Sequence, residues 1–138
     1  MKEGKIVPTK ITCGLIKKTM DSYGRDKKFL IDGYPRNKEN WDGFKEVFGT
    51  QFEILATLYL HCEEDICVSR LLSRGQSSGR IDDESAVIKK RFNTFYNESL
   101  SVLDELKNEG KFIQVDSTRT PEEVEKEVSN QIGNILNL

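Results

Sequence analysis

The segment from Phe29 to Arg36 constrains the fold of this chain more than any other, and it reads Phe-Leu-Ile-Asp-Gly-Tyr-Pro-Arg. Three apolar residues lead into an acid, a glycine and a proline, an order that predicts a buried strand over 29–32 followed by a rigid turn. Ligands of open α/β sheets bind just beyond the carboxyl ends of strands. An arginine fixed there favours a phosphate or a carboxylate, because its planar guanidinium can donate two parallel hydrogen bonds. The segment therefore predicts an anion-binding enzyme that handles nucleotides.

The charge balance limits the kind of partner. Lys and Arg total 21 against 23 for Asp and Glu, so the 138-residue chain carries a net charge of −2. A general nucleic-acid binder is expected to be strongly basic, so we expect no nucleic-acid partner. Phosphate binding must then come from a local cluster of cations. The length fits one domain with a real core.

Apolar stretches and cysteines point to a cytoplasmic protein. The longest apolar stretch, around Ile54 to Leu60, is too short to cross a bilayer, and no secretory signal follows Met1. The three cysteines, at positions 13, 62 and 67, are an odd number without the spacing of a metal site. We expect reduced thiols, no membrane association and a cytoplasmic location.

Helical and strand patterns alternate along the chain. Helices are predicted from about Thr9 to Gly24, over 38–48, 63–73 and 83–108, and from Pro121 onward; strands are predicted at 29–32, within 52–62 and at 112–116. Thr9 or a neighbour is the expected first cap. Thr120 before Pro121, with Glu123 three residues after the cap, predicts a capping box. Strands alternating with helices predict an α/β fold with a parallel sheet and flanking helices.

Four arginines, at positions 36, 74, 80 and 91, are placed where the mouth of the sheet could gather them. Residues 74–83 resemble a small lid: its glycines allow it to fold over a ligand, and Asp82 and Asp83 can orient its arginines. Such groups suit phosphoryl transfer, in which catalysis is mostly positioning and electrostatic stabilisation. The alternative is a set of surface arginines paired with acids, for example Arg91 with Glu84 or Glu98. Arg70 fits that alternative and receives no role.

Three motifs in order carry a resemblance to the nucleoside monophosphate kinases. The turn Asp-Gly-Tyr-Pro-Arg resembles their Asp-Gly-Phe-Pro-Arg signature, and Arg-Gly-Gln-Ser-Ser-Gly-Arg-Ile-Asp-Asp at 74–83 resembles the short lid of the UMP-CMP kinase branch. The opening Glu-Gly-Lys-Ile-Val-Pro at 3–8 is similar to that branch's base-binding segment. The resemblance covers essentially the whole chain and implies a P-loop-kinase-like sheet with flanking helices and a short lid.

The resemblance implies a site for the nucleoside monophosphate. The base would be bordered by Lys5, Ile6 and Val7, and the phosphate would be held by Gly33, Tyr34, Pro35 and Arg36. Asn40 would read the edge of the base. Adenylate kinases tend to carry glutamine there, so asparagine favours a pyrimidine. Tyr34 replaces the usual phenylalanine, and the sequence establishes no consequence of its hydroxyl.

The resemblance also implies the catalytic groups and the ATP contacts. Arg80 and Arg91, together with Arg36, would neutralise the phosphates of the two substrates in the transition state. Arg74 would lie over ATP, and Arg119 would offer its backbone carbonyl to adenine. Asp32 would order waters on the Mg²⁺ of MgATP, since magnesium commonly binds carboxylates through water. Its alternative role is to cap the turn after the strand.

The chain departs from the family's pattern in one respect. No Gly-x-x-x-x-Gly-Lys-Ser/Thr loop, the motif that cradles ATP phosphates, occurs in the 138 residues. The resemblance implies one kinase domain over 1–138 without the family's first two strands, in which residues 1–23 belong to the monophosphate-binding segment. We expect no meaningful turnover from these residues alone. We also expect exposed strand edges that drive self-association.

Three further hypotheses stand beside a pyrimidine nucleoside monophosphate kinase that uses MgATP. The first is an adenylate kinase, which AMP would distinguish by competing better than CMP. The second is a non-catalytic nucleotide-binding fragment, which would bind UMP or CMP without turnover. The third is an incomplete gene product with no independent function.

Overall fold

The computed structural model describes residues 7–24, 26–78 and 84–137. Its elements, in chain order, are α1 (Thr9–Tyr23), α2 (Lys38–Phe48), β1 (Thr57–His61), α3 (Glu64–Ser78), α4 (Ser85–Thr94), the π-helical turn η2 (Phe95–Ser99), α5 (Leu100–Asn108), β2 (Phe112–Asp116) and α6 (Pro121–Leu136). The two strands are parallel, and their register runs from Thr57 opposite Phe112 to His61 opposite Asp116. The helices from α3 to α5 form the long crossover that a parallel pair requires.

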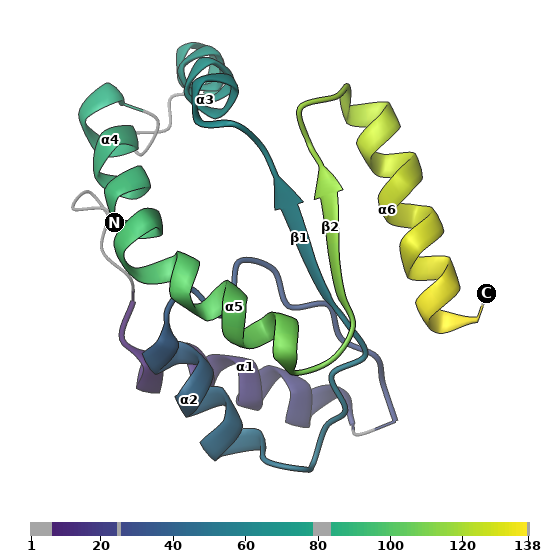
Figure 1. Ribbon diagram of the computed structural model, residues 1–138. Helices are drawn as coiled ribbons and strands as arrows, with labels where there is room; N and C mark the ends of the chain where they lie inside the picture. Colours follow the sequence, from purple (N-terminus) through teal and green to yellow (C-terminus); the bar gives the residue numbers. More distant parts are fainter. Residues whose placement is uncertain (1–6, 25, 79–83, 138) are drawn as a thin grey trace.

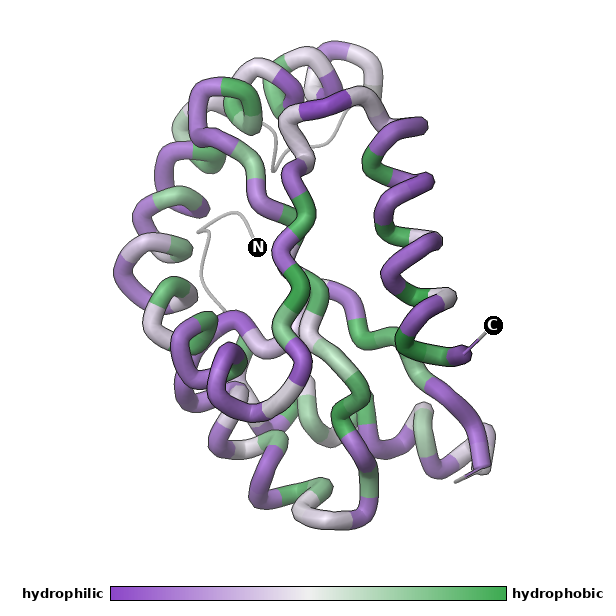
Figure 2. Tube along the Cα trace, turned by 45° about the vertical axis from the view of Figure 1, so that its right-hand side comes forward, coloured by the Kyte–Doolittle hydropathy of each residue, from purple (hydrophilic) through white to green (hydrophobic). Residues whose placement is uncertain are grey.

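Helices flank the two strands on both sides (Figure 1). Helix α6 lies beside β2, whereas α1, α2 and α5 lie on the side of β1. In Figure 2 the hydrophobic stretches of α6 lie on the flank that faces the strands. These observations confirm the predicted α/β class with a parallel sheet. None of the described helices is long and apolar enough to span a bilayer.

The sequence signals at several helix ends are confirmed. Helix α2 ends at Gly49, whose φ of 49° is a backbone conformation that favours glycine. Helix α6 has the predicted capping box between Thr120 and Glu123, with Pro121 as its first residue. The start of α1 differs from the prediction: Pro8 precedes the helix, no side-chain cap is present, and Thr9 is the first helical residue.

Two predicted segments are wrong in the described residues. Residues 29–32 form no strand, because β1 pairs only with β2 and a strand needs a hydrogen-bonded neighbour. Helix α3 continues to Ser78, so it runs past the end predicted at residue 73 and includes residues 74–78 of the predicted lid. The glycine at position 75 weakens that helix without ending it. The helix predicted over 83–108 is interrupted by η2, a π-helical turn.

The best-packed part of the chain joins α2 to α5. Trp41, Val102 and Leu106 are buried together, and Phe44, Leu103 and Phe112 pack around them. The rings of Trp41 and Phe44 are stacked with centroids 5.9 Å apart. This cluster fixes α2, and so holds the segment before α2 against the helices of the crossover.

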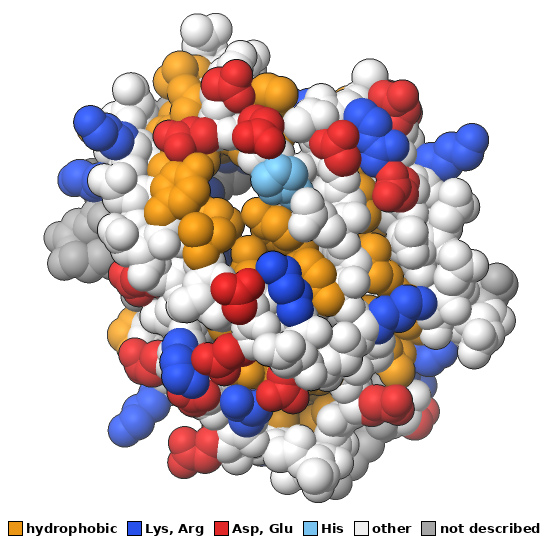
Figure 3. Space-filling model, viewed as in Figure 1, with side chains coloured by type: hydrophobic (Ala, Val, Ile, Leu, Met, Phe, Trp, Pro, Cys, Tyr) orange, Lys and Arg blue, Asp and Glu red, His pale blue; other side chains and the backbone are white. Residues whose placement is uncertain are grey.

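Apolar side chains of β1 and of the segment before α2 are less well covered than this cluster. Leu30 is 84% exposed, and Leu60 in β1 is 51% exposed. Figure 3 shows hydrophobic side chains open to solvent in the middle of the face seen in Figure 1, next to the single histidine. Unlike the α2–α5 cluster, this region leaves apolar surface in water.

Candidate functional site

The turn after residue 32 is built around Gly33. Its φ is +67°, a conformation that side chains disfavour. A Cβ at this position would lie 2.9 Å from Nη2 of Arg36. Nε of Arg36 donates to the carbonyl of Gly33 at 2.7 Å. The close approach of the guanidinium to the backbone therefore requires glycine here. The Tyr34–Pro35 peptide bond is cis.

Arg36 is held from two sides while its charge stays exposed. Its carbonyl accepts a hydrogen bond from the Ser99 hydroxyl of η2 at 2.6 Å. Its guanidinium is exposed and, among the described residues, uses only Nε for a hydrogen bond. Both Nη groups are therefore available to an anion, as the sequence suggested for a phosphate contact.

Asn40, the predicted reader of the base, is almost entirely buried, with 2% of its surface exposed. Its Oδ1 accepts a hydrogen bond from the backbone N–H of Arg36 at 3.2 Å. Its Nδ2 donates to Oγ1 of Thr9 in α1 at 2.9 Å. The backbone amide of Asn40 is itself bound by Oδ1 of Asn37, which caps α2. The carboxamide is thus held at both ends.

The Tyr34 hydroxyl, for which the sequence established no consequence, lies in the same network. It donates to the Asn40 carbonyl at 2.6 Å and lies 2.9 Å from Sγ of Cys13. A phenol has one proton, and the Asn40 carbonyl takes it, so the thiol is the donor to the Tyr34 oxygen. Burial, followed by the interaction with Cys13, raises the pKa of Tyr34 well above its ordinary value. The hydroxyl is therefore a stable donor.

The three cysteines are free thiols, as the sequence predicted, and they differ in burial. Cys13 is buried, while Cys62 and Cys67 are half-buried. Burial, and then the Cys62 neighbour, raises the pKa of Cys67 to about 11. The Cys67 thiol is therefore protonated at neutral pH.

A second cluster lies where β2 ends. The Arg70 guanidinium on α3 donates to the carbonyls of Ser117 at 2.5 Å, Thr118 at 2.9 Å and Arg119 at 3.0 Å. Arg70, to which the sequence assigned no role, is an exposed side chain that also holds the 117–119 loop through three backbone carbonyls. Its position four residues before Arg74, on the same face of one helix, is the only sequence signal that could have found it.

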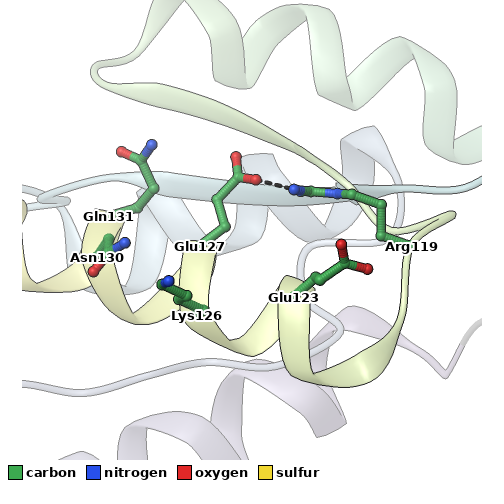
Figure 4. A pocket seen from close by; sticks show the side chains of 6 residues that line it. All are labelled: Arg119, Glu123, Lys126, Glu127, Asn130 and Gln131. Atoms are coloured by element: carbon green, nitrogen blue, oxygen red, sulfur yellow. Dashed lines mark hydrogen bonds and ion pairs between the residues drawn. The ribbon is translucent and has the colours of Figure 1, made fainter.

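The Arg119 side chain points away from this cluster, along α6. Its guanidinium is paired with Glu127 and donates to the Asp116 carbonyl. The hydrogen bond that the Arg119 guanidinium donates to Glu127 raises the pKa of Arg119. Figure 4 shows the pair at the rim of a shallow hollow lined by Arg119, Glu123, Lys126, Glu127, Asn130 and Gln131. The hollow lies on α6, on the far side of the strands from the turn at 33–36.

Some of the other predicted site residues lie outside the described ranges, and the rest lie on separate elements. Lys5, Ile6 and Arg80 lie outside the described residues, as do positions 79–83 of the predicted lid. Arg74 lies in α3, and Arg91 lies in the last turn of α4. Val7 is 39% exposed just before α1. The structure thus joins Gly33, Tyr34, Arg36 and Asn40 in one network, and Arg70 with the 117–119 loop in another.

Asp32 is the carboxylate predicted to order the waters bound to Mg²⁺. It is exposed, directly before Gly33, and has no hydrogen bond or ion pair with any described residue. Within the described ranges there is no group of three or more metal-ligating side chains. One exposed carboxylate suits a cation held chiefly by phosphates and water, because magnesium keeps most of its waters.

Comparison with known proteins places the chain in a family. The family model described as Adenylate kinase matches residues 1–111. The chain is similar to the UMP-CMP kinase of Homo sapiens, with 37% identity over 132 residues that cover 93% of this chain and 67% of that protein. The UMP-CMP kinase of Gallus gallus is 36% identical over the same share of each chain, and that of Danio rerio is 36% identical over 134 residues. The chain spans about two thirds of the length of these relatives. It belongs to the adenylate kinase family.

Proposed function

We propose that this chain contributes the acceptor site of a pyrimidine nucleoside monophosphate kinase, the enzyme that transfers a phosphoryl group from MgATP to UMP or CMP. The observation that carries the proposal is the turn at 33–36, where the exposed Arg36 guanidinium uses only Nε for a hydrogen bond with a described residue, and the backbone N–H of Arg36 binds the buried carboxamide of Asn40. The names of the relatives support a pyrimidine acceptor.

The two ends of the monophosphate would be recognised by different chemistry. Arg36 would hold the phosphate through two charge-assisted hydrogen bonds, and Gly33, Tyr34 and Pro35 would shape the surrounding backbone. Asn40 would bind the edge of the base, and Lys5, Ile6 and Val7 would border it. An asparagine amide supplies one donor and one acceptor side by side, which matches the N3 and C4 edge of a pyrimidine.

In the transfer step, an oxygen of the bound monophosphate attacks the γ-phosphorus of ATP. A P–O bond forms to the acceptor, the P–O bond to ADP breaks, and the leaving ADP keeps the electron pair. Arg36, Arg80 and Arg91 would neutralise the charge shared by the two substrates. Closure of a lid over 74–83 would exclude the water that would otherwise hydrolyse ATP.

The ATP contacts in this chain would be few. Arg74 would lie over the nucleotide, and the carbonyl of Arg119 would accept from adenine with the lone pair that Arg70 leaves unused. Mg²⁺ would arrive with ATP and neutralise its phosphates, and Asp32 would hold its waters. Because the 138 residues contain no Gly-rich lysine loop, we expect them to bind the acceptor nucleotide without meaningful turnover.

Calorimetric titration of the 138-residue chain with CMP, UMP and AMP tests the proposal. We expect CMP or UMP to bind more tightly than AMP. Arg36→Ala should weaken binding about ten- to a hundred-fold, because a hydrogen bond to a charged group contributes about 1.5–3 kcal/mol. Lys27→Ala is the matched control, since it removes the same charge from an exposed side chain that pairs with Asp26.

Three outcomes would contradict the proposal in different ways. Tighter binding of AMP would favour an adenylate kinase. Equal effects of the two variants would mean that only the overall charge matters. Phosphoryl transfer from MgATP to CMP at ordinary kinase rates, measured in a coupled assay, would contradict the expected absence of turnover.

A further inference from the structure

We infer that Thr9 is a positioning residue that orients the Asn40 carboxamide for base recognition. The inference rests on the proposed function, and it concerns a side chain of α1 that does not itself contact the nucleotide. The observation that carries it is the hydrogen bond of 2.9 Å from Nδ2 of Asn40 to Oγ1 of Thr9, two residues 31 positions apart that are both buried.

The chemistry of the neighbours fixes which way the carboxamide faces. The backbone N–H of Arg36 can only donate, so the atom that it meets must be the acceptor Oδ1. Nδ2 is then directed to the other end, where it needs an acceptor. The Thr9 hydroxyl supplies that acceptor. Rotating the amide by half a turn would place N–H against N–H at Arg36 and break that bond.

The backbone of Asn40 is held as firmly as its side chain. The Tyr34 hydroxyl donates to its carbonyl at 2.6 Å, and Oδ1 of Asn37 accepts from its amide at 2.9 Å. Thr9 itself is fixed by close packing, because a Cβ added to Gly43 of α2 would overlap the Thr9 methyl group. The Thr9 hydroxyl therefore cannot easily follow a moving carboxamide, and it defines where Nδ2 lies.

The carboxamide keeps one donor and one acceptor for a ligand. Nδ2 has two hydrogens and Oδ1 two lone pairs, and among the described residues one of each is used. The remaining N–H and lone pair occur in a fixed order. A base that meets this edge finds a preorganised partner, which avoids the entropic cost of orienting the amide on binding.

Substitutions at Thr9 separate this role from a general contribution to folding. Thr9→Val keeps the shape and removes the hydroxyl, so Nδ2 loses its partner. Thr9→Ser keeps the hydroxyl and removes the methyl group that packs on Gly43. A merely structural role predicts damage from both variants, whereas an orienting role predicts that only Thr9→Val weakens recognition of the base.

The experiment measures, by calorimetry, the affinities of CMP and of ribose 5-phosphate, a probe that has the phosphate but no base. We expect Thr9→Val to reduce the preference for CMP over ribose 5-phosphate about five-fold, the size of one ordinary hydrogen bond. The affinity for ribose 5-phosphate should stay the same, because Arg36 is untouched. Thr9→Ser should keep the preference of the wild-type chain.

The outcomes distinguish this inference from the proposed function. If the wild-type chain prefers CMP and Thr9→Val leaves that preference intact, the orienting role is wrong and the proposed function stands. If Thr9→Val weakens both ligands equally, or Thr9→Ser loses the preference as well, the role of Thr9 is structural and the inference is overturned. If the wild-type chain binds CMP no better than ribose 5-phosphate, base reading by Asn40 fails, and the inference fails with it.

Discussion

Two regions of this molecule differ in the burial and hydrogen bonding of their side chains. Around α1, the 33–37 turn and the start of α2, Asn40 is only 2% exposed and both ends of its carboxamide are hydrogen-bonded, whereas Nε1 of the equally buried Trp41 has no hydrogen-bond partner among the described residues. In β1 and in the segment before α2, apolar side chains face solvent, and Leu60 and Leu30 are 51% and 84% exposed. Burying a polar group without a partner is costly, so the paired network in the first region indicates a site whose geometry is already set.

The hydrogen bonds of the proposed acceptor site are made without the sheet. They come from α1, the turn, α2 and the Ser99 hydroxyl of η2, and none of them comes from a strand. We therefore expect this chain to bind a nucleoside monophosphate without transferring a phosphoryl group to it. Substitutions that disturb one of the two regions should leave the other intact.

The largest effect is expected from Trp41→Ala, which breaks the well-packed region. The indole lies between α2 and α5, against Val102 and Leu106. Loss of such a buried ring costs about 3–5 kcal/mol, since a cavity remains. Denaturant unfolding followed by circular dichroism measures the change. Trp41→Phe, as the control, should lose much less, and equal losses would mean that the packing of this cluster is not what stabilises the chain.

Gly33→Ala should be the next most damaging change. The residue would have to adopt a φ of +67°, and its Cβ would lie 2.9 Å from Nη2 of Arg36. The backbone conformation alone costs about 1–2 kcal/mol, and displacement of the guanidinium should weaken CMP binding as well. Gly14→Ala is the control, because nothing lies within 4 Å of a Cβ there. That variant should stabilise α1 slightly, and a similar loss in both would refute the special role of the turn.

Tyr34→Phe tests the hydroxyl at the centre of the network. Its removal leaves the Asn40 carbonyl without a donor and should cost about 1 kcal/mol at neutral pH. The pKa of Tyr34 is raised in the folded chain, so its contribution is complete below about pH 10, the ordinary pKa of tyrosine, and falls as the pH rises toward the folded value.

The measurement is the free energy of unfolding as a function of pH between pH 7 and 11. The wild-type chain should lose stability above pH 10 more steeply than Tyr34→Phe. Tyr23→Phe provides the comparison, because Tyr23 is 66% exposed on α1 and makes no hydrogen bond with a described residue. Parallel curves for Tyr34→Phe and the wild-type chain would show that the hydroxyl is not held as described.

The smallest effect on stability, within about 0.5 kcal/mol, is expected from Leu30→Ser, because the side chain is already in water. Its effect should fall on association. We propose that the chain self-associates through the exposed apolar side chains of β1 and of the segment before α2, and sedimentation at micromolar concentration should show a lower mass for this variant. Leu15→Ser, at a 61% exposed position on α1, should leave the mass unchanged. A monomeric wild-type chain would contradict the proposal.

Much of the fold could be predicted because its signals are local. The capping box at Thr120, the glycine after α2 and the apolar run of β2 each specify an element through neighbouring residues. The strand expected at 29–32 was wrong because pairing depends on a neighbour, which an apolar run cannot supply. The length of α3 was missed for a related reason: Gly75 and the serines after it weaken a helix without ending it.

The site was predictable in its residue types and not in its contacts. The turn motif indicated an anion held by Arg36, and the structure places that guanidinium against Gly33. The bond between Thr9 and Asn40, and those from Arg70 to the 117–119 loop, join residues 31 and 47 to 49 positions apart. Neither set of hydrogen bonds could be predicted from neighbouring residues in the sequence, because such bonds depend on how whole helices pack.

We propose that the monophosphate site is formed by the turn at 33–36 and by the start of α2. Amide hydrogen exchange of the 138-residue chain, with and without saturating CMP, tests it most directly. We expect CMP to slow exchange at residues 33–40 and to leave α6 unchanged. Slower exchange around the hollow between Arg119 and Gln131, with no change at residues 33–40, would contradict the account.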